Sequence, residues 1–198
     1  MANFTFLTIE KEGLSDYRDR GSKFFGYAYP VLSSEDARHK LRQLKKLHPK
    51  ASHFCFAWRF GAGGETVRVS DDGEPSGSAG KPIEGQIQSR NLTNVLVVVV
   101  RYFGGSLLGV PGLIQAYRTA ASEALQQSGI VEKKVEYELS IEFDYTKMND
   151  VMILVRQVDG SIGSQEMGLF CRYRLLIPLE HKERAIKLLA DLHGVTIL

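Results

Sequence analysis

The segment from Ser70 to Pro82 combines residue types that could hold a ligand. Three acids, Asp71, Asp72 and Glu74, open it, and Lys81 stands near its end. Carboxylates are the ligands that hard divalent cations prefer, whereas converging glycine N–H groups helped by a lysine bind anions. Neither the P-loop nor the Ca²⁺-loop spacing is present, and these residues are also common turn formers. Three interpretations stay open: a metal site, an anion site, or a loop whose acids bind its own amides.

The segment from Arg101 to Gly112 joins an apolar run to a predicted helix. The apolar run is followed directly by Arg101, Tyr102 and Phe103, and then by glycines. The partial positive charge at a helix start, beside an aromatic surface, would suit a phosphate group or an RNA base. In the alternative interpretation, Tyr102 and Phe103 belong to the core and the glycines serve a tight crossover.

Nucleophilic catalysis has little support from the serines, histidines and cysteines. The chain has no Gly-x-Ser-x-Gly elbow, and its histidines lack metal-ligand spacing. His53 and Cys55 share one face of a predicted strand and formally make a Cys–His pair. Cys55 and Cys171 each stand in an apolar run, which predicts buried thiols rather than a disulfide or a metal site. We assign no catalytic residue and expect no cofactor.

The strands that must position these segments are visible as apolar patterns. Residues 54–60 alternate with period two, and a glycine-rich turn leads to residues 66–70, which predicts an antiparallel hairpin. Residues 95–102 are apolar without alternation, as in a central strand covered on both faces. Residues 21–30 predict a glycine-entered aromatic strand.

Two helices are predicted in the same part of the chain. The first is capped by Ser33 and ends at His48-Pro49. The second carries Pro111 in its first turn and ends near Gly129. The inner face of the first helix is predicted to comprise Ala37, Leu41, Leu44 and Leu47.

The remainder of the chain predicts a second, smaller domain. Its pattern reads strand, helix, strand, strand, helix, strand, which is the ferredoxin-like order. We therefore expect an N-terminal domain at 1–131 and a C-terminal domain at 132–198, with a polar linker at Glu132–Lys134. The predicted elements are 135–143, 146–158, 161–166, 169–178, 181–192 and 194–198.

Composition and charge limit the class of protein and the cellular location that we expect. Hydrophobic residues make up 43% and charged residues 24% of the chain, as in ordinary globular proteins. Residues 1–130 hold 16 Lys and Arg against 12 Asp and Glu, and the rest holds 9 against 11, so a polyanion should prefer the first domain. The start of the chain has no targeting pattern, and the longest apolar run, Val95 to Val100, cannot span a bilayer. We expect a cytoplasmic protein with no membrane partner.

The chain resembles the IMPACT family, in its bacterial two-domain form. The resemblance is carried chiefly by Asp71-Asp72-Gly73-Glu74-Pro75-Ser76-Gly77 and Arg101-Tyr102-Phe103-Gly104-Gly105, which occur in family order. The family's usual glycine and arginine at the following helix are Pro111 and Gln115 here, which shifts weight for an anion site towards Arg101 and Lys81. The candidate binding residues are Arg59, Asp71, Asp72, Glu74, Ser76, Lys81, Arg101, Tyr102, Gly104 and Gly105; if a metal binds, its ligands are Asp71, Asp72 and Glu74.

The resemblance implies a two-layer α/β first domain, like one shared by a ribosomal small-subunit protein and elongation factor G, followed by a ferredoxin-like domain. It also implies translational control, although eukaryotic members reach their kinase-activator partner through a further N-terminal domain. We expect a non-enzymatic protein that binds the ribosome, RNA or a translation-associated protein through first-domain loops. The alternatives are a metal-assisted hydrolase of a phosphate-containing substrate, and a protein adaptor that uses the edge of the ferredoxin-like sheet.

Overall fold

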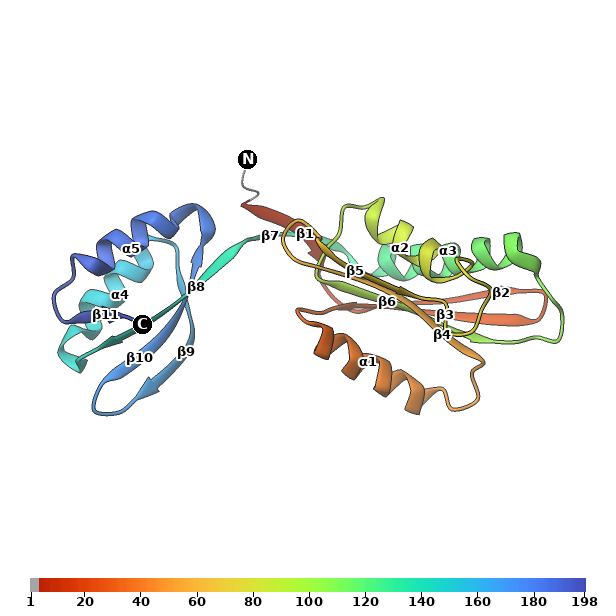
Figure 1. Ribbon diagram of the computed structural model, residues 1–198, viewed down its shortest axis with the longest axis horizontal. Helices are drawn as coiled ribbons and strands as arrows, with labels where there is room; N and C mark the ends of the chain where they lie inside the picture. Colours follow the sequence, from red (N-terminus) through yellow and green to blue (C-terminus); the bar gives the residue numbers. More distant parts are fainter. Residues whose placement is uncertain (1–3) are drawn as a thin grey trace. The chain divides into compact units, whose positions relative to one another are not determined.

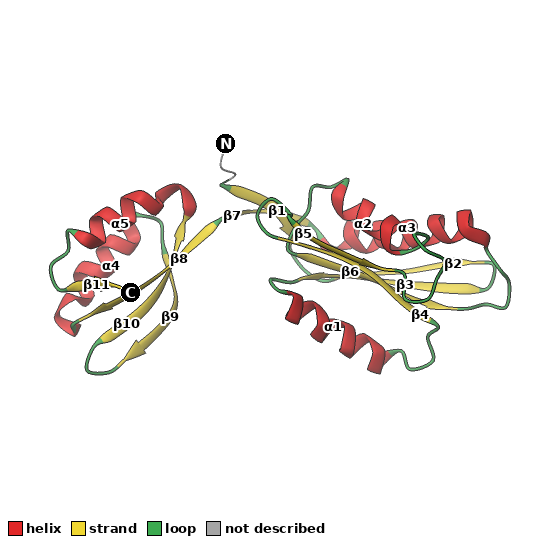
Figure 2. Cartoon of the chain, in the orientation of Figure 1, coloured by secondary structure: helices red, strands yellow, loops and turns green. Residues whose placement is uncertain are grey.

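The computed structural model describes residues 4–198 as two compact α+β units (Figures 1 and 2). The first unit is Phe6–Lys133, and the second is Lys134–Leu198 with the described residues before Phe6. The predicted fold class, α+β in two domains, is confirmed. Among the described residues, no helix has the length and apolar character needed to cross a membrane.

The first unit is built on a five-stranded antiparallel sheet. Its strand order is β2, β3, β6, β4, β5, with β6 at the centre as predicted. The strands are β2 (Gly13–Asp19), β3 (Ser22–Pro30), β4 (His53–Phe60), β5 (Thr66–Ser70) and β6 (Val95–Tyr102). The predicted hairpin is confirmed, because β4 pairs with β5 from Phe56 and Ser70 to Phe60 and Thr66.

Helices cover both faces of this sheet (Figures 1 and 2). α1 (Ser34–Leu47) lies on one face, and α2 (Gly80–Gln88) and α3 (Gly109–Ser128) lie on the other. The first unit therefore has three layers, whereas the family resemblance implied a two-layer arrangement. The reason lies in β6, where Val97 faces α3 and Val98 faces α1, and a strand apolar on both sides needs cover on both.

The boundaries of α1 follow its capping residues. The Ser33 hydroxyl accepts a hydrogen bond from the Asp36 N–H at 3.1 Å, and the His48 N–H closes the helix on the Leu44 carbonyl at 2.8 Å. Ala37 and Leu44 are buried as predicted, but Leu47 is exposed. At about 100° per residue, Leu47 lies about 80° from Ala37 around the axis and has turned away from the sheet.

Four elements have no counterpart in the sequence prediction. They are β1 (Thr5–Ile9), β2, α2 and β7 (Ile130–Lys134). The two units divide within the predicted linker at Glu132–Lys134, but these residues form part of β7, which pairs with β1 in a two-stranded sheet. Its side chains are mostly exposed and polar, so backbone hydrogen bonds define the strand and no apolar pattern reveals it.

The second unit has the predicted ferredoxin-like order, with the sheet β11, β8, β10, β9. Ile141, Val155, Leu175 and Leu189 contribute to one core between this sheet and both helices. Cys55 and Cys171 are buried free thiols, as predicted. The elements are β8 (Glu136–Phe143), α4 (Met148–Gln157), β9 (Ser161–Met167), β10 (Cys171–Pro178), α5 (Lys182–Ala190) and β11 (Val195–Ile197), with single 3-10 turns at Tyr145–Lys147 and Leu179–His181.

Candidate functional site

Asp71 holds the acidic loop in shape. Its Oδ1 accepts hydrogen bonds from the N–H groups of Ala79 at 3.0 Å and Gly80 at 2.8 Å, and its Oδ2 accepts from Gly77 at 2.9 Å. Burial opposes ionisation of this carboxyl, but the three backbone donors and nearby Lys81 together lower its pKa. Asp71 therefore folds the loop back on itself and starts α2 at Gly80.

Asp72 ties the same loop to the sheet. Its Oδ2 accepts the Phe54 N–H at 2.7 Å, and its backbone carbonyl lies 2.8 Å from His53 Nδ1. Both aspartates thus serve the third interpretation of the sequence, in which the acids bind amides of the protein itself. Neither carboxylate shares a hydrogen-bond partner with the Glu74 carboxylate.

Glu74 is the acid that joins the two motif segments. Its side chain is 4% exposed, and its Oε1 accepts hydrogen bonds from Arg101 Nη1 at 2.5 Å and from the Tyr117 hydroxyl at 2.7 Å. Arg101 is 6% exposed and lies over the rings of Phe24 and Phe103. This is a buried, charge-compensated pair, so the guanidinium is not a free cation.

Glycine at position 104 lets the second segment approach β3. The Ser22 hydroxyl accepts the Gly104 N–H at 3.1 Å and lies 3.5 Å from Arg101 Nη2. A Cβ at Gly104 would stand 1.9 Å from the Gly21 carbonyl carbon, which is far inside van der Waals contact. The Arg-Tyr-Phe-Gly-Gly turn therefore fixes the position of Arg101 through its backbone.

A cleft of about 470 Å³ opens above the Glu74–Arg101 pair. Ser52, His53, Glu74 and Arg101 form its polar part, and the remaining lining is largely apolar. The β4–β6 register brings these elements together by placing His53 opposite Arg101. The apolar lining consists of Pro75, Phe103, Leu107, Leu108, Val110 and Leu113, with Gly109 between them.

His53 is the polar group of the cleft that sequence analysis assigned only to an unpromising Cys–His pair. Its side chain is 25% exposed, and its Nε2 lies 3.8 Å from Glu74 Oε1. Cys55 instead donates its S–H to the Asp71 carbonyl at 3.0 Å, and burial raises the pKa of this thiol. The pair is therefore not arranged as an activated nucleophile and base.

The remaining candidate residues lie away from the base of the cleft. Arg59 stands opposite Val95 at the far end of β4, and its guanidinium donates to the Gly64 carbonyl at 3.1 Å. Tyr102 points to the α1 side of the sheet, where its hydroxyl lies 2.9 Å from His48 Nδ1. Ser76, Lys81 and Gly105 are exposed.

The three acids do not gather as the metal hypothesis requires. Asp71 and Asp72 are bonded to backbone amides, while Glu74 is bonded to Arg101 and Tyr117. Within residues 4–198, no group of three His, Cys, Asp or Glu side chains is arranged to hold a metal ion. Tyr117 was not predictable as a site residue, since a buried tyrosine inside a helical pattern looks like an ordinary core residue.

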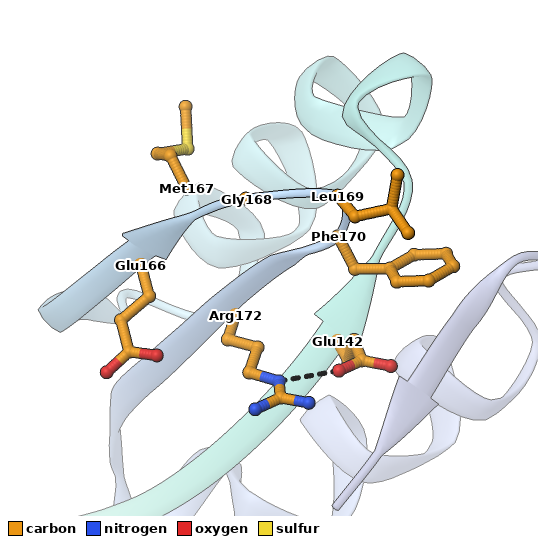
Figure 3. A pocket seen from close by; sticks show the side chains of 7 residues that line it. All are labelled: Glu142, Glu166, Met167, Gly168, Leu169, Phe170 and Arg172. Carbon is orange, nitrogen blue, oxygen red and sulfur yellow. Dashed lines mark hydrogen bonds and ion pairs between the residues drawn. The ribbon is translucent and has the colours of Figure 1, made fainter.

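A second hollow, of about 290 Å³, lies at the turn between β9 and β10 (Figure 3). Met167, Leu169 and Phe170 are exposed on this turn, and Arg172 Nε donates to Glu142 Oε2 at 2.6 Å. Its apolar side chains stand on a single turn and its ion pair faces solvent, so it offers a ligand less enclosure than the cleft. β9 is also one of the two edge strands of the ferredoxin-like sheet, whose exposed edge the adaptor hypothesis invoked.

Comparison with known proteins gives consistent similarities. The Impact N-terminal domain model matches residues 20–125. The chain is 34% identical to the IMPACT family member YvyE of Bacillus subtilis, covering 74% of this chain and 68% of that protein, and 35% identical to YigZ of Escherichia coli, covering 73% and 72%. A crystal structure of a hypothetical protein is similar over 100% of this chain and 98% of its own, with a TM-score of 0.76 and 28% identity.

Proposed function

The chain belongs to the IMPACT family, and from this premise we propose that it is a non-enzymatic, cytoplasmic module that binds a protein of the translation apparatus through the cleft of its first unit. The family resemblance supports the link to translation. The cleft supports binding of a protein surface, since it is a concave site between loops carried by a rigid sheet.

The observation that carries this proposal is the rim of the cleft, which is apolar and lies above the charge-compensated Glu74–Arg101 pair. Phe103, Leu107 and Val110 are exposed on the rim, whereas Arg101 and Glu74 compensate each other beneath it. Clustered exposed apolar side chains are typical of protein interaction sites. A phosphate group at the same base would meet the Glu74 carboxylate, so the geometry favours a protein partner over direct RNA binding by Arg101.

The same contacts give less support to a metal-assisted hydrolase. Asp71, Asp72 and Glu74 would each have to exchange their present hydrogen bonds for a cation, and the loop and the Arg101 pair would both have to open. Binding of an apolar side chain needs no such rearrangement.

Co-sedimentation of the full chain with bacterial ribosomes tests the proposal. Leu107→Asp puts a charge on the rim, and Leu32→Asp is the matched control, because the two leucines are 84% and 79% exposed and Leu32 lies outside the cleft lining. We expect pelleting that persists as salt is raised and that Leu107→Asp weakens at least about 10-fold, from the loss of one buried leucine.

Two results would contradict the proposal. One is the absence of pelleting at every salt concentration, and the other is equal pelleting of both variants and the wild type. Binding that disappears with moderate salt would indicate a phosphate-directed contact elsewhere on the chain instead.

A further inference from the structure

We propose that the base of the cleft recognises a hydroxyl group at the tip of an aromatic side chain, so that the residue a partner inserts is a tyrosine. This inference rests on the proposed function for the identity of the partner. Its chemistry comes from a hydrogen-bond acceptor at the base, His53 Nε2, which lies 3.8 Å from the already bonded Glu74 Oε1.

The tautomer of His53 follows from its backbone contact. Its Nδ1 lies 2.8 Å from the Asp72 carbonyl oxygen, which can only accept a hydrogen bond. In the neutral imidazole the proton must therefore sit on Nδ1, and Nε2 presents a lone pair. His53 lines the cleft and a quarter of its side chain is accessible, so the imidazole can contact a molecule in the cleft.

Glu74 does not supply a donor to His53 Nε2, so a donor to this atom can come from a ligand. Nε2 and Oε1 are 3.8 Å apart, and neither can donate to the other while the imidazole is neutral. A ligand O–H near both atoms could donate to Nε2 beside the carboxylate, at ordinary hydrogen-bond distances. The Arg101 and Tyr117 bonds to Glu74 already hold this carboxylate in place.

The charges at the base favour a neutral donor. His53, Glu74 and Arg101 are the titratable groups of the cleft lining, and Glu74 and Arg101 compensate each other. An ammonium group would lose its hydration without finding an unpaired carboxylate, which is costly in a site with apolar walls. A hydroxyl group meets the acceptor with a much smaller loss of hydration.

The walls favour an aromatic carrier for that hydroxyl. Phe103, Leu107 and Leu113 line a volume of about 470 Å³, which is in the range of sites that enclose small molecules. Serine and threonine would leave most of this apolar lining uncovered. The ring of a tyrosine would cover the apolar lining, and its hydroxyl lies at the far end of the ring. This combination suits a site with apolar walls and one hydrogen-bond acceptor.

A pair of matched probes tests the role of the hydroxyl. p-Cresol and toluene differ by that group alone, and each is titrated into the full chain while backbone amide shifts are followed by NMR. We expect shifts at cleft residues such as His53 and Phe103, with p-cresol bound about 3- to 10-fold tighter than toluene, the effect of one net hydrogen bond.

The variant His53→Phe isolates the acceptor. It removes Nε2 and also the bond to Asp72, but a general loosening of the loop affects both probes, so the ratio of their affinities reports Nε2 itself. We expect the ratio to fall to about 1. The control is His39→Phe on the exposed face of α1, which should leave the affinity ratio unchanged. If a folded His53→Phe variant also leaves the ratio unchanged, the acceptor has no role.

Three outcomes overturn the inference: equal affinity of the wild type for both probes, a ratio that survives His53→Phe, and no shifts at cleft residues up to the solubility of the probes. Its failure is distinct from failure of the proposed function. Ribosome pelleting that depends on Leu107 without p-cresol selectivity refutes only the hydroxyl contact, whereas selectivity without pelleting refutes only the translation partner.

Discussion

Removing the Glu74 carboxylate should destabilise the first unit strongly. Glu74→Ala removes the counter-charge of Arg101, whose side chain is 6% exposed in the wild type and whose Nε has no hydrogen-bond partner there. The Tyr117 hydroxyl loses its acceptor in the same step. An uncompensated buried charge is among the few causes of large mutational effects.

The expected cost is about 3–5 kcal/mol, the range for breaking one side of a buried ion pair. With a urea m value of about 2 kcal/mol per molar, the midpoint should fall by roughly 1.5–2.5 M. Replacing both partners, as Glu74→Leu with Arg101→Met, should recover most of this loss, because apolar residues of similar size remove the unpaired charge.

Trp58 supplies the assay. It is the chain's single tryptophan and is buried in β4, so its fluorescence follows unfolding of the first unit. Glu35→Ala is the control, since Glu35 pairs with Arg42 at 2.9 Å but is 67% exposed, and its loss should leave the midpoint almost unchanged. A Glu74→Ala midpoint equal to that of the control would refute the idea that the Glu74–Arg101 pair supports the cleft.

Four further substitutions have defined outcomes by the same fluorescence measurement. Gly104→Ala should destabilise the first unit by about 1–3 kcal/mol through its clash with Gly21. Gly85→Ala, in open space inside α2, should stabilise it by about 0.5–1 kcal/mol. A Gly104→Ala variant more stable than Gly85→Ala would contradict this reasoning. The pKa of Asp71 is lowered in the folded state, because its backbone donors outweigh the effect of burial. Its contribution to the free energy of unfolding is therefore complete above the pKa of the unfolded state, near 4, and is lost as the pH falls through the lower pKa of the folded state. Asp71→Asn should therefore be less stable than wild type at pH 7 and approach it in acid, and a constant gap between about pH 7 and 3 would exclude this linkage. Ser33→Ala should cost about 1 kcal/mol by removing the α1 cap, and no loss would show that the cap is dispensable.

Strands with alternating or continuous apolar side chains were predictable, but strands that bury small residues were not. In β2, Gly13 and Ser15 face α3, where a Cβ on Gly13 would lie 2.0 Å from the Ala124 carbonyl oxygen and the Ser15 hydroxyl donates to the Ala120 carbonyl at 2.7 Å. The close approach of helix and strand selects small residues. It thereby removes the apolar signal on which sequence prediction depends.

The candidate site was predictable in its segments but not in its pairings. The sequence marks both motif segments as unusual, yet Glu74 and Arg101 meet only because the β4–β6 register places His53 opposite Arg101. Arg59 illustrates the limit, since it shares β4 with His53 but lies six residues away, about 20 Å along the strand. Strand register is a long-range property, and no local pattern of these residues reports it.

The groups around His53 agree with the proposed binding function. General acid and base catalysis needs a group that exchanges protons readily near neutral pH. Burial raises the pKa of both the Cys55 thiol and the Tyr117 hydroxyl, which keeps them protonated, and Glu74 is committed to Arg101. His53 therefore has no activated nucleophile beside it in the cleft. A fixed acceptor beneath apolar walls discriminates among side chains that enter, and that discrimination is what a binding module requires.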